Sequence, residues 1–237
     1  WQHLQWGFVH GFTALTGTTF TADLYTSGQF TVTAELYTSG DVTFSTGFTA
    51  AAGSTFSGDL YAAADATFNA GLTANAGSTF SGDLYTAGDT TFSTGFTALT
   101  GTTFTADLYT SGQFTVTAEL YTSGDVTFST GFTAAAGSTL SGDLYAAADA
   151  TFNAGLTANA GSTFSGDLYT AGDTTFSTGF TALTGTTFTA DLYTSGQFTV
   201  TAELYTSGDV TFSTGFTAAA GSTFSGDLYT AGDTTFS

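Results

Sequence analysis

A twelve-residue repeat runs through nearly the whole chain and constrains its fold more than any other feature. Nineteen such units fill residues 8–235. They are nested in a longer repeat of 84 residues, because the string GFTALTGTTF starts at Gly11, Gly95 and Gly179. So short a period predicts an array in which each unit packs only against its neighbours. We therefore expect residues 1–7 to form a non-repeating cap or linker and residues 8–237 to form one repeat array.

Side chains alternate in character along each unit. Counted from its first residue, which is usually Phe, odd positions hold Phe, Leu, Ala, Gly and Thr without charge, and even positions hold mostly Thr, Ser, Asp and Tyr. A period of two indicates β-strands, because successive side chains of a strand point to opposite faces. We expect one strand of about eight residues per unit, followed by a turn that contains Gly. At Gly28, Gly40 and Gly53 such a turn tolerates a positive φ.

The fold class that this pattern predicts is all-β. Two types of unit mostly alternate, so we expect a β-solenoid or β-arcade with 24-residue coils, in which two facing sheets enclose the apolar side chains. The alternative is an antiparallel β-meander of the same units, which avoids stacking like charges on one another. The predicted core ladder consists of Phe20, Leu24, Phe44, Phe48, Phe56, Leu60, Phe68, Leu72, Phe80 and Leu84.

The composition excludes several classes of function. The chain has no Lys, Arg, Cys, Pro or Met, and its 19 acidic residues give a formal net charge of −19. It therefore lacks thiol chemistry and the basic surface that nucleic acids require. No apolar run approaches the ~18 residues of a membrane helix. We expect a protein that is not an enzyme, does not bind nucleic acid and does not span a membrane.

The residues of this chain that could bind a metal are its two histidines and its acids. His3 and His10 are the only histidines and have no ligand-type residue close by, so we expect no metal site there; Trp1 and Trp6 are expected to cover the first layer. Acids recur six residues apart in Gly-rich turns. Four of them are candidates for a calcium site, whereas solvated charge is the principal expectation; these four are Asp59, Asp65, Asp83 and Asp89. No other cofactor is expected.

Threonines recur in a T-x-T/S pattern that predicts two parallel columns of hydroxyl groups on a flat sheet. The members singled out are Thr19, Thr21, Thr31, Thr33, Thr43 and Thr91. This array resembles the Thr columns of insect antifreeze β-solenoids, which implies binding to ice or another regular surface. The alternative is that Thr is present for its β propensity and cross-strand hydrogen bonds. Exposed Ser and Thr can also carry O-linked glycans.

The phrases TFNAGL, TANAGS, TFSGDL and YTAGDT resemble the low-complexity shafts of phage tail fibres and other bacterial surface fibres. The resemblance implies an extended β-helical rod. We therefore expect a structural protein of the cell surface or extracellular space, which forms a filament, sheath or fibre shaft with itself as partner. A functional amyloid and the ice-binding solenoid are the alternatives. Because the chain opens on Trp1 instead of Met, we also expect a processed chain or an excerpt of a longer polypeptide.

Overall fold

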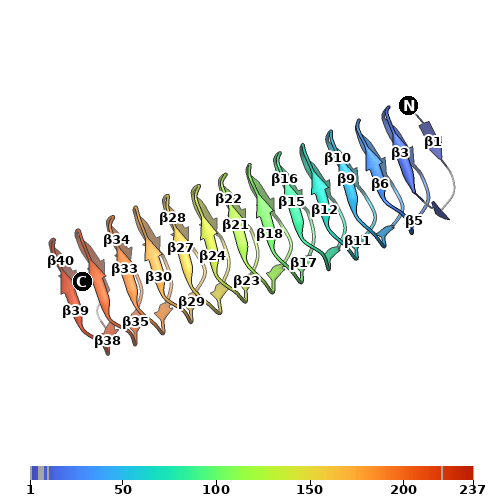
Figure 1. The fold of residues 1–237 in the computed structure, drawn as a ribbon. Helices are drawn as coiled ribbons and strands as arrows, with labels where there is room; N and C mark the ends of the chain where they lie inside the picture. Colours follow the sequence, from blue (N-terminus) through green and yellow to red (C-terminus); the bar gives the residue numbers. More distant parts are fainter. Residues whose placement is uncertain (1, 5–7, 10, 220, 237) are drawn as a thin grey trace. The chain divides into compact units, whose positions relative to one another are not determined.

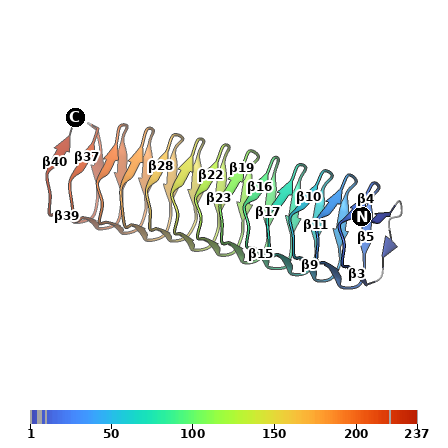
Figure 2. The same cartoon turned by 90° about the horizontal axis from the view of Figure 1, so that it is seen from above.

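The computed structural model describes residues 2–4, 8–9, 11–219 and 221–236 and is all-β, with no helix among them. The chain divides into two units, Trp1–Ala118 and Glu119–Ser237. Each unit is a β-solenoid with three parallel sheets, here called A, B and C. Within each unit the strands of one sheet lie side by side as successive coils stack (Figures 1 and 2). The expected all-β solenoid is confirmed.

In the first unit the three sheets take every third strand. Sheet A is β1 (Gln2–Leu4), β4 (Thr18–Phe20), β7 (Leu36–Thr38), β10 (Ser54–Phe56), β13 (Leu72–Ala74), β16 (Thr90–Phe92) and β19 (Leu108–Thr110). Sheet B is β2 (Phe8–Val9), β5 (Leu24–Thr26), β8 (Val42–Phe44), β11 (Leu60–Ala62), β14 (Ser78–Phe80), β17 (Phe96–Ala98) and β20 (Phe114–Val116). Sheet C is β3 (Phe12–Ala14), β6 (Phe30–Val32), β9 (Phe48–Ala50), β12 (Ala66–Phe68), β15 (Leu84–Thr86) and β18 (Thr102–Phe104).

The second unit follows the same rule. Sheet A is β22 (Val126–Phe128), β25 (Leu144–Ala146), β28 (Ser162–Phe164), β31 (Phe180–Ala182), β34 (Phe198–Val200), β37 (Phe216–Ala218) and β40 (Thr234–Phe236). Sheet B is β23 (Phe132–Ala134), β26 (Ala150–Phe152), β29 (Leu168–Thr170), β32 (Thr186–Phe188), β35 (Leu204–Thr206) and β38 (Thr223–Phe224). Sheet C is β21 (Leu120–Thr122), β24 (Ser138–Leu140), β27 (Leu156–Ala158), β30 (Thr174–Phe176), β33 (Leu192–Thr194), β36 (Val210–Phe212) and β39 (Leu228–Thr230).

The coil is shorter than the sequence predicted. From β3 onward parallel partners are 18 residues apart, as in Leu24↔Val42 and Tyr61↔Thr79, so each coil there has three six-residue sides. The expected 24-residue coil with two sheets is therefore wrong, and parallel pairing rules out the antiparallel meander. Strands have two or three residues instead of about eight, and each twelve-residue unit supplies two of them.

The apolar core lies inside the triangle formed by the three sheets. The first and last residues of a strand point inward and the middle residue points outward, as the burial of β4 and β5 shows. All ten residues of the predicted ladder lie in this core, each with an exposed fraction of 2% or less, and they come from all three sheets. The ladder therefore lines one enclosed interior instead of a seam between two sheets.

The sequence alternates two types of strand, whereas each coil contains three strands. This mismatch distributes the large side chains evenly along the core. Most strands carry one large and one small inward residue, and the order reverses from one strand to the next. Because three is odd, strands stacked in one sheet have opposite orders, so that Phe20 lies beside Thr38 and Leu36 beside Thr18. This alternation avoids a continuous column of Phe rings, which would overpack the interior. The FTV strands are the exception, and Phe30 stacks on Phe12 with ring centroids 4.8 Å apart.

Hydrogen bonds between coils extend beyond the short strands. The N–H of Leu24 donates to the carbonyl oxygen of Asp41 at 2.8 Å, and that of Ser45 donates to Thr26 at 3.0 Å. Positive φ is recorded, among the described residues, only at Gly11 and Gly221. The turns at Gly40 and Gly53 therefore do not use the positive φ that glycine tolerates there. At Gly40 glycine is required by space, because a Cβ would lie 2.5 Å from the backbone of Ala22.

Candidate functional site

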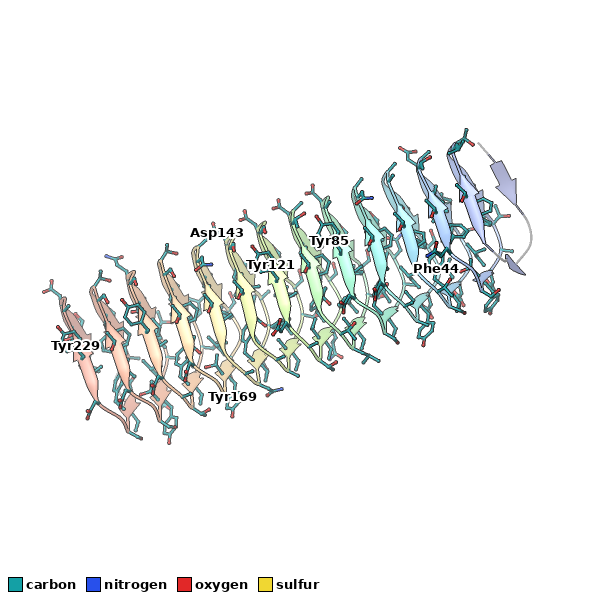
Figure 3. The ribbon with its side chains drawn as sticks, viewed as in Figure 1. Phe44, Tyr85, Tyr121, Asp143, Tyr169 and Tyr229 are labelled. Carbon is teal, nitrogen blue, oxygen red and sulfur yellow. The ribbon has the colours of Figure 1, made fainter. Side chains whose placement is uncertain are left out.

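The outer surface of each sheet is built from two residue types. The middle residue of every three-residue strand from β3 to β40 is Thr or Tyr. The eleven tyrosines are the large residues of this surface, and all have exposed fractions between 40% and 47% except Tyr229 at 64%. Figure 3 shows Tyr121 and Tyr229 on the sheet that faces the viewer and Tyr169 at the lower edge.

The predicted threonine columns do not share one face. Thr19 and Thr91 are middle residues of sheet A, whereas Thr31 belongs to sheet C and Thr43 to sheet B. Thr21 and Thr33 lie after β4 and β6, outside the strands. The expected pair of columns on one flat sheet is wrong at these positions. In the second unit, however, sheet A carries a run of five threonines in register, which are Thr163, Thr181, Thr199, Thr217 and Thr235.

The 84-residue repeat does not preserve the faces. It contains fourteen six-residue sides, which is not a multiple of three, so equivalent residues in successive repeats fall on different sheets. Within the first unit, Tyr25 lies on sheet B and its counterpart Tyr109 lies on sheet A. Within the second unit, Tyr121 lies on sheet C and Tyr205 on sheet B. The repeat therefore distributes its side chains around the solenoid and assigns no special chemistry to one sheet.

The acids share a single structural position. All 19 lie immediately before a strand, at a corner of the triangle. At several corners a carboxylate accepts a hydrogen bond from the backbone N–H of the next coil. Asp23 Oδ1 accepts from Asp41 at 3.0 Å, Asp41 Oδ1 from Asp59 at 2.9 Å, and Asp59 Oδ1 from Gly77 at 2.9 Å. These bonds tie successive coils together and compensate for stacking like charges.

The calcium candidates do not form the pairs that their sequence spacing suggested. Asp59 and Asp65 lie at different corners, as do Asp83 and Asp89, because a spacing of six advances by one side of the coil. Asp65 and Asp83 are the two that stack, and Asp65 Oδ1 accepts the Asp83 N–H at 3.0 Å. Among the residues that the structure describes, no group of three or more His, Asp or Glu side chains could hold a metal ion.

Most expectations for the first ten residues concern residues outside the part of the chain that the structure describes. Gln2–Leu4 pairs in parallel with Thr18–Phe20, so the backbone of this stretch continues sheet A. The predicted covering role of Trp1 and Trp6 and the absence of a metal at His10 concern residues outside the described part. The side chain of His3 is also outside it.

Four shallow grooves combine the two kinds of outward side chain. Each contains a corner acid, the Tyr two residues later, and the corner glycine and central threonine of the next coil. Three of them also include the glycine and threonine one coil further, whereas the groove at Asp143–Tyr145 extends to Asp125 and Thr127 of the preceding coil. The grooves at Glu35–Tyr37 and Asp59–Tyr61 have volumes of 450 and 380 Å³. Those at Glu119–Tyr121 and Asp143–Tyr145 have volumes of 360 and 310 Å³. We call these four the acid–tyrosine grooves.

The grooves were not predicted from the sequence, although the tripeptide that supplies their acid and tyrosine is visible there. Every one of the eleven tyrosines stands in an acid-Leu-Tyr tripeptide, DLY or ELY. The acid and the Tyr are two residues apart and therefore project from the same outward side, while the Leu between them is buried. What the sequence could not show is which residues lie one coil further, since that requires the 18-residue register.

Comparisons with known proteins found no relative of this chain. No protein-family model, curated protein or solved structure matches the chain. No helix in the described ranges is long and apolar enough to cross a membrane.

Proposed function

We propose that this chain is a structural protein of an extracellular filament, sheath or fibre shaft, assembled by axial stacking of its coils, and that it is not an enzyme. One observation carries the proposal: the apolar core of each coil is covered only by the adjacent coils. Leu168 and Phe176 lie between two coils and are 1% and 0% exposed, whereas Leu228 and Phe236 at the same inward positions of β39 and β40 are 41% and 55% exposed. A further coil stacked there, from any source, would bury them.

The chemistry of the surface supports the same proposal. Each of the two halves of the chain repeats the same outward residues on all three sheets, whereas an active site is one asymmetric arrangement of groups. Nineteen negative charges without a single positive one oppose side-by-side clumping of chains but leave axial contacts, which are apolar and hydrogen-bonded, available. These properties suit a shaft that must stay dispersed while it lengthens.

Electron microscopy over a range of protein concentrations tests the proposal. We expect filaments that lengthen with concentration for the wild type. The double variant Leu228→Asp/Phe236→Asp places charges on the open core edge and should abolish them. Tyr229→Asp adds a charge to the same strand but on its outward side, and should leave filaments intact. Wild-type protein that stays monomeric throughout, or equal behaviour of the two variants, would contradict axial stacking.

A second candidate function, binding to ice or another regular surface, has one observation in its favour. The five in-register threonines of sheet A in the second unit form a regular column at the strand spacing of about 4.8 Å. Thermal hysteresis of the monomer tests it. If it is correct, Thr181→Leu/Thr199→Leu on this column should remove the activity, whereas Thr157→Leu/Thr175→Leu on sheet C should retain it.

A further inference from the structure

We propose that the acid–tyrosine grooves bind arginine side chains of a basic polypeptide partner. The proposal does not rest on filament formation, because the grooves are complete within a single unit. It starts from charge. The 237 residues contain 19 acidic side chains and no Lys or Arg to neutralise them. A surface of one sign attracts ligands of the other, and a basic polypeptide supplies the cationic side chains that these residues lack.

Each groove presents a carboxylate with unused acceptor capacity. Asp59 and Asp143 use Oδ1 to accept the N–H of Gly77 and Gly161, each at 2.9 Å. Their second oxygens have no hydrogen-bond partner among the described residues. Glu35 and Glu119 are one methylene longer and neither carboxylate has a partner in the described part of the chain. All four acids are exposed at the corner, where a cationic group can reach them.

The tyrosine beside each carboxylate offers a second contact of the right kind. Tyr37, Tyr61, Tyr121 and Tyr145 are each 42–44% exposed. In the next coil the strand centre is Thr in all four cases, for example Thr79 beside Tyr61 and Thr163 beside Tyr145. Because Thr is much smaller than Tyr, the side of the ring that faces the next coil is not covered by another ring. A cation over a tyrosine ring is attracted by its quadrupole.

Glycines provide the space. Gly77 and Gly95 line the groove at Asp59, and Gly161 lines the groove at Asp143. Without Cβ atoms these corners leave room next to the carboxylate for a flat group. Tyr25 and Tyr193 lack this space, because the corner beyond Asp23 is Asp41 and the corner beyond Asp191 is Asp209. They are therefore tyrosines that do not line the four acid–tyrosine grooves.

Among cationic side chains, the guanidinium group of Arg fits best. It is planar, stacks on aromatic rings, and donates two parallel hydrogen bonds to a carboxylate, whereas the Lys ammonium is a compact point charge. A ring and a carboxylate side by side in a shallow groove correspond to these two features. An extended segment with exposed arginines can engage the grooves, and grooves on different sheets can recruit separate segments.

Binding of a short oligo-arginine peptide, followed by calorimetry at physiological ionic strength, tests the proposal. The oligo-citrulline peptide has the same shape without the charge and should not bind. Oligo-lysine should bind more weakly than oligo-arginine. Tyr61→Thr/Tyr145→Thr should weaken oligo-arginine binding at these two grooves by about threefold to tenfold. Tyr25→Thr/Tyr193→Thr makes the same change outside the grooves and should leave affinity unchanged.

A second pair of variants separates the grooves from general charge attraction. Asp59→Asn/Asp143→Asn and Asp41→Asn/Asp149→Asn each change the net charge from −19 to −17. We expect a clear loss of affinity only for the first pair. Equal losses for both pairs would overturn the proposal, as would no binding of oligo-arginine or oligo-lysine binding as tightly. Circular dichroism of every variant checks that the solenoid is retained.

Discussion

One stretch of sequence occurs twice in the second unit, in two different surroundings. Residues 167–176 and 227–236 both read DLYTAGDTTF. In the first copy Leu168 and Phe176 are 1% and 0% exposed, whereas in the second Leu228 and Phe236 are 41% and 55% exposed. The local strands form in both places, so the difference comes from the coil that covers the first copy and not the second. Burial in this protein is a property of stacking, not of the repeat by itself.

The largest expected effect follows directly from this contrast. Phe176→Ala removes a fully buried ring and should lower the free energy of unfolding by about 3–5 kcal/mol. Phe236→Ala removes a half-exposed ring from the same sequence and should cost less than about 1 kcal/mol. Urea denaturation of the two variants measures the difference. Equal midpoints would mean that the coils do not bury one another as described.

The repeated stretch also holds a pair of threonines that differ in the same way. The Thr174 hydroxyl donates to Thr170 Oγ1 at 2.9 Å in the core, whereas Thr234 donates to Thr230 Oγ1 at 3.3 Å where it is exposed. Thr174→Val leaves a buried hydroxyl unpaired and should destabilise by about 1–3 kcal/mol. Thr234→Val should be nearly neutral, because water replaces the lost partner. A stable Thr174→Val variant would show that this core hydrogen bond contributes nothing.

Both copies are attached to the preceding coil by a corner carboxylate. Asp149 Oδ1 accepts the Asp167 N–H at 3.0 Å, and Asp209 Oδ1 accepts the Asp227 N–H at 2.9 Å. Asp149→Ala removes the acceptor and should cost about 0.5–1.5 kcal/mol. Asp149→Asn keeps an acceptor oxygen and should recover most of the loss. Hydrogen exchange at the Asp167 amide gives a local readout, and the bond contributes nothing if that amide exchanges equally fast in the wild type and both variants.

The smallest effect concerns a single phenol on the outer surface. Hydrogen bonds with Ser213 and then Ser195 lower the pKa of Tyr193 below its ordinary value, against a smaller opposing effect of burial. A lowered pKa favours the ionised phenol in the folded state, so its contribution to stability is present at high pH and is lost as pH falls through the folded pKa. Ultraviolet titration should show one early-ionising tyrosine, absent in Tyr193→Phe and present in Tyr169→Phe. The same early step in Tyr193→Phe would assign it to another residue.

The sequence predicted the fold class and the core but not the coil. Alternation along each unit was sufficient to place Phe20 and Leu24 inside. The number of strands per coil has no direct signature, because the twelve-residue period reports the alternation of two strand types and not the closure of the coil. The six-residue period was present in the burial-prone positions, for example Leu24, Phe30 and Leu36, but the stronger twelve-residue repeat masked it.

The surface was harder to predict than the core for the same reason. Thr19 and Thr31 look like members of one column in the sequence, and they lie on different sheets only because the coil turns after six residues. Likewise, the acid-Leu-Tyr tripeptide is visible in the sequence. The glycines that complete a groove stand 18 and 36 residues after the acid, where only the three-dimensional register brings them together.

The central claim is that consecutive coils stack with an 18-residue register. Because the chain has no Cys, spin labels can be placed at chosen pairs of positions and their dipolar coupling measured by electron paramagnetic resonance. Labels at positions 163 and 181 should couple strongly, since Thr163 and Thr181 are neighbours on adjacent strands. Labels at 163 and 187 should couple weakly, because Thr187 lies on another sheet. Strong coupling for the second pair and weak coupling for the first would contradict the account.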